Sequence, residues 1–157
     1  MKLRTAYNTI LILASLGLLL SGYLSYWNIW GPSCHQGPLS WLVSCGGPQK
    51  VLIFGLPTCV YGFFMYLAVA TTAVIGLTTN RHRPAFGTLI GLGALGTAFA
   101  GGLMLYEIFV LKLAFTTVPA CVYGLVLYLG ILGAALAARR STSWTQAQPP
   151  TTSPPQV

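Results

Sequence analysis

Long apolar runs separated by short polar segments dominate the chain, at about residues 6–30, 51–77, 86–111 and 119–138. Each run reaches the roughly 20 residues that an α-helix needs to cross the hydrocarbon layer of a bilayer. The first run follows Lys2 and Arg4 in the manner of a signal sequence. It is longer than the roughly 7–15-residue apolar core of a cleaved signal, and no Ala-x-Ala spacing occurs at its end. The pattern predicts an all-α fold, an integral membrane four-helix bundle.

An internal repeat relates the two halves of this bundle. Residues 56–67 can be laid over residues 118–129, and seven of the twelve pairs are identical, including a shared Pro-x-Cys-Val-Tyr-Gly segment. A weaker similarity places residues 22–26 over residues 102–106. Because the two hairpins then run in the same direction, the repeat predicts a pseudo-twofold axis along the membrane normal, the parallel-repeat arrangement. The two Pro-x-Cys segments should face each other near one surface of the membrane.

Small residues recur along the third run, beginning with Gly87-x-x-x-Gly91. This spacing lets a second helix approach closely in a membrane. We therefore expect the Gly87 and Gly91 face to be a helix contact.

The composition agrees with a membrane protein, because 55% of the residues are hydrophobic and only 6% are charged. The surface of a water-soluble domain does not tolerate that balance. The net charge of +7 does not indicate nucleic acid, since the cations are scattered at the ends of apolar runs instead of sharing one face. The expected partner of most of the surface is membrane lipid, and the expected organisation is one transmembrane domain over residues 1–140.

The distribution of cations also predicts the orientation of the chain. Four spans place both termini on one side, and this side carries most of the cations. Under the positive-inside rule the termini are then cytoplasmic and the loop of residues 31–50 is outside, as in a multi-pass protein of the cell membrane. Residues 141–157, rich in Pro, Thr, Ser and Gln, predict a disordered cytoplasmic tail. The cations on the cytoplasmic side are Lys2, Arg4, Arg81, Arg83, Arg139 and Arg140, and those opposite are Lys50 and Lys112.

Two cysteines of the repeat, Cys59 and Cys121, follow a proline by two residues at the expected beginning of a helix. Proline is favourable in the first turn, where its missing N–H breaks no hydrogen bond. The unpaired amides and the positive end of the helix dipole stabilise a thiolate there. A free cysteine is also commonly a small buried apolar residue. The symmetric placement of this pair favours a redox or disulfide role over simple packing.

All four cysteines of the chain lie outside or at the outer membrane edge in this topology. An even number in an oxidising compartment favours disulfides, with three possible connectivities. Cys34 with Cys45 closes a ten-residue loop, and Cys59 with Cys121 follows the repeat, so we choose this pairing. The loop disulfide can equally be a plain structural staple. No metal site is expected, because no Cys-x-x-Cys spacing is present.

These residues resemble the vitamin K epoxide reductase family over roughly residues 10–138. The resemblance rests on Cys34 and Cys45, on the segment Phe54-Gly55-Leu56-Pro57, and on the segment from Tyr106 to Lys112 that precedes Cys121. The family includes bacterial members that reoxidise a periplasmic thioredoxin-like protein with quinone. The chain departs from the family at its Cys-x-x-Cys pair, where it has Val118-Pro119-Ala120-Cys121.

The resemblance implies a quinone-linked thiol oxidoreductase. An extracytoplasmic thioredoxin-like protein would give electrons to Cys34 and Cys45 by thiol–disulfide exchange. They would pass to Cys59 and Cys121, with Cys59 replacing the lost cysteine, and then to a membrane quinone. An apolar slot with aromatic walls suits a quinone, although these tyrosines can equally serve as ordinary packing. The expected cofactor-binding residues are Phe54, Tyr61, Tyr106, Glu107 and Tyr123.

Glu107 is the only acidic residue of the chain, and it lies in an apolar span, where an ionisable group is a candidate functional residue. It can supply a proton to reduced quinone or simply pair with Lys112, five residues later. Two other functions stay open. One is a non-catalytic, disulfide-stabilised bundle that acts as a binding or assembly subunit, which the missing Cys-x-x-Cys favours. The other is a small transporter, which the near absence of polar residues in the spans disfavours.

Overall fold

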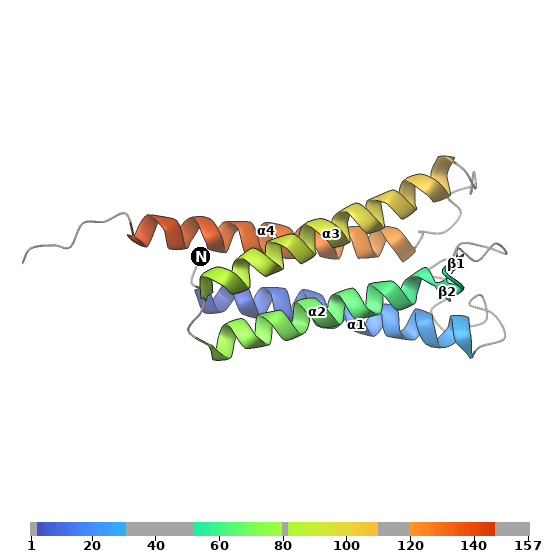
Figure 1. Cartoon of the computed structure of the whole chain (residues 1–157), viewed down its shortest axis with the longest axis horizontal. Helices are drawn as coiled ribbons and strands as arrows, with labels where there is room; N and C mark the ends of the chain where they lie inside the picture. The colour runs from blue at the N-terminus through green and yellow to red at the C-terminus, as the bar shows by residue number, and fades with distance from the viewer. Residues whose placement is uncertain (1–2, 31–51, 80–81, 110–119, 147–157) are drawn as a thin grey trace, which may run out of the picture.

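The computed structural model describes residues 3–30, 52–79, 82–109 and 120–146. In this part of the chain four long helices lie roughly along one direction, and a short two-stranded hairpin sits at one end of the bundle (Figure 1). Each helix is long and apolar enough to span a membrane, which confirms the prediction of an all-α membrane bundle. The elements are α1 (Leu3–Ile29), β1 (Leu52–Ile53), β2 (Leu56–Pro57), α2 (Thr58–Thr78), α3 (His82–Phe109) and α4 (Ala120–Gln146).

The helices form two antiparallel hairpins that pack side by side, α1 with α2 and α3 with α4 (Figure 1). Across the hairpins, α1 packs against α4 and α2 packs against α3. Each helix thus has two neighbours, and one apolar core runs along the centre of the bundle. The outward faces carry large apolar side chains such as Leu19, Leu95 and Val126, each more than half exposed, which suits contact with lipid acyl chains.

The buried positions reproduce the internal repeat. In α1 and α3 the buried residues that correspond are Tyr7, Ile10, Ala14, Gly17 and Ser21, and Phe86, Leu89, Gly93, Gly96 and Ala100. In α2 and α4 they are Tyr66, Val69, Ala73 and Gly76, and Tyr128, Ile131, Ala135 and Ala138. Each series has the same spacing as its counterpart, so the prediction of two parallel-repeat hairpins is confirmed. When α1 and α3 are aligned by their buried positions, Tyr7 corresponds to Phe86. This alignment differs by one residue from the one that residues 22–26 and 102–106 suggested, because the inward faces of the helices correspond and the residue identities do not.

Equivalent aromatic side chains meet each other where the two repeats touch. Tyr66 stacks on Tyr128 with ring centroids 4.4 Å apart and an interplanar angle of 12°. Nearer the other end of the bundle, Tyr7 stacks on Phe86 at 4.6 Å and 27°. Stacked rings contribute roughly 0.5–1.5 kcal/mol beyond their buried area. These contacts between equivalent residues mark the position of the pseudo-twofold axis.

The second apolar run does not begin as a helix at about residue 51, as the sequence suggested. Residues 52–57 form the antiparallel hairpin instead, with Leu52 opposite Pro57, and α2 begins at Thr58. The turn has positive φ at Phe54 (50°) and Gly55 (81°), as in the type I′ turns that suit two-residue hairpin loops. Hydropathy alone cannot separate an apolar hairpin from the first turns of an apolar helix.

At the other end of the chain, α4 continues to Gln146, so the first six residues of the predicted disordered tail are helical. No glycine or proline occurs between Ala134 and Gln146 to interrupt the helix. The outer loop of residues 31–50 and the tail from residue 147 lie outside the described residues, and the expectations for them stay predictions.

The predicted helix contact at Gly87 and Gly91 is wrong. Both residues are exposed, and a Cβ atom at either would have no neighbour within 4 Å. The contact face of α3 instead carries Gly93 and Gly96, which face Leu132 and Tyr128 of α4. The small residues on this helix occupy more than one face, so the spacing alone did not identify the packed one.

Candidate functional site

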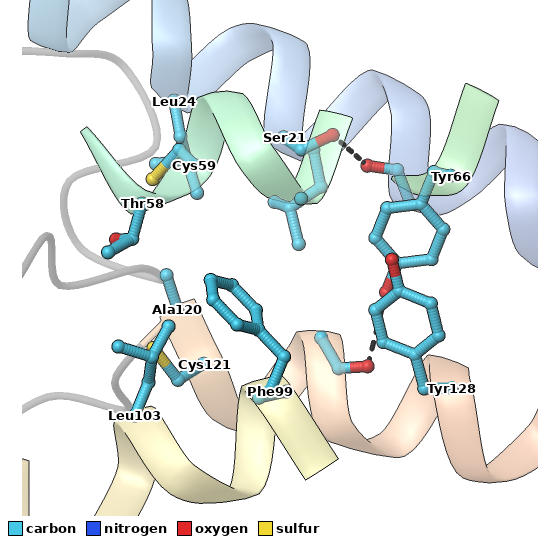
Figure 2. A pocket seen from close by; sticks show the side chains of 15 residues that line it. Ser21, Leu24, Thr58, Cys59, Tyr66, Phe99, Leu103, Ala120, Cys121 and Tyr128 are labelled. Carbon is cyan, nitrogen blue, oxygen red and sulfur yellow. Dashed lines mark hydrogen bonds between the residues drawn. The ribbon is translucent and has the colours of Figure 1, made fainter. Parts of the chain in front are cut away.

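A partly open cavity lies between the two hairpins. Figure 2 shows Cys59 and Cys121 at one end of it and the stacked pair of Tyr66 and Tyr128 at the other. The lining is almost entirely apolar, and all four helices contribute to it. The lining residues are Gly17, Leu20, Ser21, Leu24, Thr58, Cys59, Gly62, Tyr66, Phe99, Ala100, Leu103, Ala120, Cys121, Gly124 and Tyr128.

Cys59 lies in the first turn of α2, directly after the hairpin. Pro57 precedes this helix in extended conformation, with φ −60° and ψ 140°, and no side chain caps the first turn. The thiol is free and partly buried. The Asn28 side chain at the end of α1 donates from Nδ2 to Cys59 Sγ over 4.0 Å and to the Leu24 carbonyl over 3.1 Å. Sulfur is a weak acceptor, so this contact orients Cys59 more than it stabilises the neutral thiol.

Cys121 occupies the equivalent place in the first turn of α4, and its free thiol is also partly buried. Its Sγ donates to Glu107 Oε1 at 3.7 Å. Glu107 is only 8% exposed, and its Oε2 is buried with no hydrogen-bond partner among the described residues. In the burial register of the repeat, Asn28 of α1 is the counterpart of Glu107 of α3. Each cysteine is thus paired with a polar side chain from the preceding helix of its own hairpin.

The predicted Cys59–Cys121 disulfide is not formed in the structure, where both residues are free thiols that share one end of the cavity. The disulfide therefore stays a prediction. Cys34 and Cys45 lie outside the described residues, so their pairing and their distance from the cavity stay predictions as well. Within the described ranges, no group of three or more His, Cys, Asp or Glu side chains gathers in a way that could hold a metal ion.

None of the five residues predicted to bind a quinone lines this cavity. Phe54 is 97% exposed at the tip of the hairpin, and Tyr106 is 46% exposed. The Tyr61 hydroxyl donates to the Ile53 carbonyl at 2.8 Å and so ties the hairpin to α2. Glu107 contacts Cys121 from behind the cavity wall, and Tyr123 is partly buried near the beginning of α4. Their role in cofactor binding stays a prediction.

Sequence reasoning missed several residues that do line or support the site. Tyr66 and Tyr128 close the cavity, and the Tyr66 hydroxyl donates to the Gly124 carbonyl at 3.1 Å. Both tyrosines belong to the repeated segment, which was a usable signal. Asn28 could have been found only from the burial register of α1 and α3, because no identical residue marks its equivalence to Glu107.

The arrangement suits thiol chemistry next to an apolar ligand. Two cysteines in the first turns of α2 and α4 open onto a cavity with few polar groups. Apolar walls with a few polar groups are typical of small-molecule sites. The site can therefore place a flat apolar molecule beside two sulfur atoms.

Comparison with known proteins agrees with this chemistry. No curated protein matches the chain significantly. The family model described as the vitamin K epoxide reductase family matches residues 8–115, more than half of the 157 residues, and this match ends before α4 and Cys121. Members of this family are quinone-linked oxidoreductases of membranes. The matched length, the four membrane-spanning helices and the cysteine-lined cavity together show that the chain belongs to the vitamin K epoxide reductase family.

Proposed function

We propose that the protein is a membrane thiol–disulfide oxidoreductase that passes electrons from an extracytoplasmic thioredoxin-like protein to a membrane quinone. The path runs through Cys34 and Cys45 and then through Cys59 and Cys121. The observation that carries this proposal is the shared cavity, which is lined by one cysteine from each repeat. An inter-helix pair would take the place of the Cys-x-x-Cys pair that Val118 interrupts.

The polarity and the hydrogen-bonding groups of the cavity support a quinone ring as its ligand. Phe99, Leu103 and the Tyr66–Tyr128 stack supply flat apolar walls. The Tyr128 hydroxyl is buried and has no hydrogen-bond partner among the described residues. A buried hydroxyl without a partner is costly, and a carbonyl oxygen of the ligand would accept its hydrogen bond. We assign Tyr128 as the polar anchor and Phe99 and Tyr66 as the walls.

The bound quinone would supply a two-electron acceptor at the end of the path. On the protein side, oxidation of Cys59 and Cys121 to a disulfide removes two electrons and two protons. Few polar groups line the cavity, so the protons need an acceptor beside the two sulfurs. Glu107, which already accepts the Cys121 S–H, is the group placed to take one of them.

Turnover of the purified protein tests this function. A small dithiol such as dithiothreitol is the electron donor, a short-chain quinone is the acceptor, and the absorbance of the quinone is followed without oxygen. Cys59→Ser and Cys121→Ser should each lower the rate to the uncatalysed level. Thr71→Val, a change on the exposed face of α2, should leave the rate as in wild type. A rate that is independent of both cysteines would exclude the proposed path.

A non-catalytic bundle is the second candidate, and one observation favours it. The chain lacks the first cysteine of the family's Cys-x-x-Cys pair, and Cys59 and Cys121 are free thiols in the structure. The same assay separates the two functions, because a binding or assembly subunit would show no quinone reduction even with a large excess of dithiol.

A further inference from the structure

The two repeats place their cysteines alike but give them different polar neighbours. Asn28 and Glu107 hold equivalent positions in α1 and α3, and each reaches the cysteine of its own hairpin. The Asn28 amide can donate to sulfur, whereas the Glu107 carboxyl accepts a proton from it. A second difference has the same direction, because the Thr58 side chain also hydrogen-bonds Cys59, whereas the equivalent residue in the other repeat is Ala120.

The difference has a direct effect on which sulfur can hold a negative charge. A hydrogen bond from an amide stabilises a thiolate more than a neutral thiol, because bonds to charged groups are stronger. A carboxylate beside a thiol does the opposite, since two negative charges repel strongly where the surroundings are apolar. Cys59 therefore has the better environment for a thiolate, and Cys121 has the better environment for a protonated thiol.

Glu107 itself is suited to hold a proton. It is almost fully buried, and its Oε2 has no hydrogen-bond partner among the described residues, where the neighbour of its Oε1 is the Cys121 thiol. Lys112, the cation that the sequence offered as its partner, lies outside the described residues. Burial favours the neutral form of this carboxyl group, because an isolated buried charge is costly. Glu107 therefore gives its proton only to a group that holds it more strongly, such as the thiolate of Cys121. Glu107 thus stores one proton directly beside Cys121.

We propose that Asn28 and Glu107 make the two sulfurs unequal: Cys59 is the sulfur that leaves as a thiolate, and Cys121 is the sulfur that forms the mixed disulfide and is then protonated by Glu107. The inference deepens the proposed function and rests on the Cys59–Cys121 disulfide that this function requires. Asn28 is a positioning residue in this scheme, and Glu107 acts on the reacting sulfur.

The exchange begins when a thiolate of the dithiol donor attacks Cys121 of the disulfide. A bond forms between the donor sulfur and Cys121 while the Cys59–Cys121 bond breaks. The electron pair goes to Cys59, whose thiolate receives the Asn28 hydrogen bond. The second thiolate of the donor then displaces Cys121, which leaves the donor oxidised to its disulfide. Cys121 takes the Glu107 proton across the 3.7 Å contact between Cys121 Sγ and Glu107 Oε1, and Glu107 is protonated again from the medium before the next turnover.

The first test measures the reactivity of each thiol in the reduced, full-length protein. Iodoacetamide, which is uncharged and reacts with thiolates, is added for increasing times, and modification of each cysteine is read by mass spectrometry. Asn28→Asp should slow modification of Cys59 by about tenfold, and Glu107→Gln should speed modification of Cys121 by about tenfold, as expected for one hydrogen bond or charge contact to a thiolate. The alkylation rate of each cysteine is compared between variant and wild type, so a difference between Cys59 and Cys121 in access to iodoacetamide does not affect the comparison.

The double variant Asn28→Asp/Glu107→Gln exchanges the two environments at nearly constant side-chain volume and should reverse the order of reactivity. A general loss of packing would instead expose both cysteines and speed both reactions. If Asn28→Asp does not fold, Asn28→Leu removes the donor without adding charge and should slow Cys59 alone. Changes within about twofold at both cysteines would overturn the inference.

The second test locates the mixed disulfide. Oxidised protein is mixed with glutathione, quenched with acid, and mapped by mass spectrometry. Wild type should carry glutathione mainly on Cys121, and the double variant should carry it mainly on Cys59. Glutathione on Cys59 in wild type contradicts the proposed order.

The two tests together separate this inference from the proposed function. If no Cys59–Cys121 disulfide forms while the alkylation pattern holds, the proposed function fails and the unequal thiols stand. If the disulfide forms but the two thiols react equally in every variant, the inference fails and the proposed function stands.

Discussion

At the scale of single residues, Gly17 and Gly96 show how closely the two repeats correspond. Gly17 lies against the Tyr66 ring and Gly96 against the Tyr128 ring, and a Cβ atom at either position would overlap its tyrosine. The stacked partner keeps each ring from moving aside. Glycine is therefore required at both positions for close approach and not for an unusual backbone angle.

Alanine at Gly96 should destabilise the bundle by about 1–3 kcal/mol, the usual cost of overpacking a core. Gly17→Ala should have a similar effect through Tyr66. The matched control is Gly91→Ala, on the same helix as Gly96, where an added Cβ meets no neighbour within 4 Å. Thermal unfolding in detergent, followed by circular dichroism, measures all three. Equal melting temperatures for Gly96→Ala and Gly91→Ala would show that the tyrosine stack is not packed as described.

The hydroxyls of the two stacked tyrosines should differ in their effects. Tyr66→Phe removes the hydrogen bond to the Gly124 carbonyl and should cost about 1 kcal/mol of stability. Tyr128→Phe removes a buried hydroxyl that has no partner among the described residues, so it should leave the ligand-free protein equally stable or slightly more stable. It should weaken binding of a short-chain quinone by about tenfold, the loss of one hydrogen bond. Stability and quinone titration together distinguish the two variants.

At the scale of elements, the hairpin before α2 positions Cys59. Phe54 and Gly55 both have positive φ, which is costly for phenylalanine and not for glycine. The Tyr61 hydroxyl donates a hydrogen bond to the Ile53 carbonyl, and Tyr61 is the third residue after Thr58, where α2 begins. A strained turn tied to the first turn of the helix fixes where α2 begins, and hence where its cysteine lies.

Gly55→Ala should loosen the hairpin, since alanine disfavours positive φ by about 1 kcal/mol. Phe54→Asn should do the reverse, because asparagine tolerates the left-handed region. Hydrogen exchange of the peptide that covers residues 52–57, read by mass spectrometry, should rise in the first variant and fall in the second. Unchanged exchange in Gly55→Ala would mean that the turn does not need its positive φ.

The elements also show which features could be predicted from the sequence and which could not. The four spans follow from long apolar runs, and the equivalence of α2 and α4 follows from seven identical residues in twelve. The beginning of α2 could not be predicted, because an apolar hairpin and an apolar helix have the same hydropathy. The packed face of α3 was predicted at Gly87 and Gly91 but lies at Gly93 and Gly96, since in a lipid-facing helix small residues occur on several faces.

The sequence predicted one part of the candidate site, the two cysteines, but not the residues of the cavity walls. The repeat predicts that Cys59 and Cys121 lie close together, because it places them at equivalent helix starts, and both residues line the cavity. The residues of the cavity walls were not predicted, since the direction of a side chain depends on the rotation of its helix about the helix axis. Tyr66 points inward toward Tyr128, while Tyr106 and Phe54 are exposed.

At the scale of the whole molecule, the duplicated hairpin explains why a cavity exists at all. Two similar hairpins meet through equivalent faces, and small residues at Gly62, Ala100 and Gly124 keep the helices from filling the space between them. The same duplication brings two cysteines to one end. Function then depends on the few positions where the halves differ, of which Asn28 and Glu107 are the clearest.

The orientation of this cavity in the membrane can be tested directly. In a variant without native cysteines, Trp30→Cys at the cysteine end of the bundle should react with a membrane-impermeant maleimide in intact cells. Arg4→Cys, at the opposite end of α1, should react only after the membrane is permeabilised. This orientation is expected because the end of the bundle that carries both termini has an excess of cations, which favours the cytoplasmic side. Labelling in the opposite order would place the cavity entrance on the cytoplasmic side.

Quinone should oxidise Cys59 and Cys121 to a disulfide and be reduced to quinol, and mapping this disulfide tests the proposed function most directly. Fully reduced protein is incubated without oxygen with an oxidised short-chain quinone, the remaining thiols are blocked in acid, and the disulfides are identified by mass spectrometry. We predict a Cys59–Cys121 disulfide that appears together with one quinol for each bond formed. Cys59 and Cys121 that both stay open to alkylation after excess quinone has been added would contradict the proposed function.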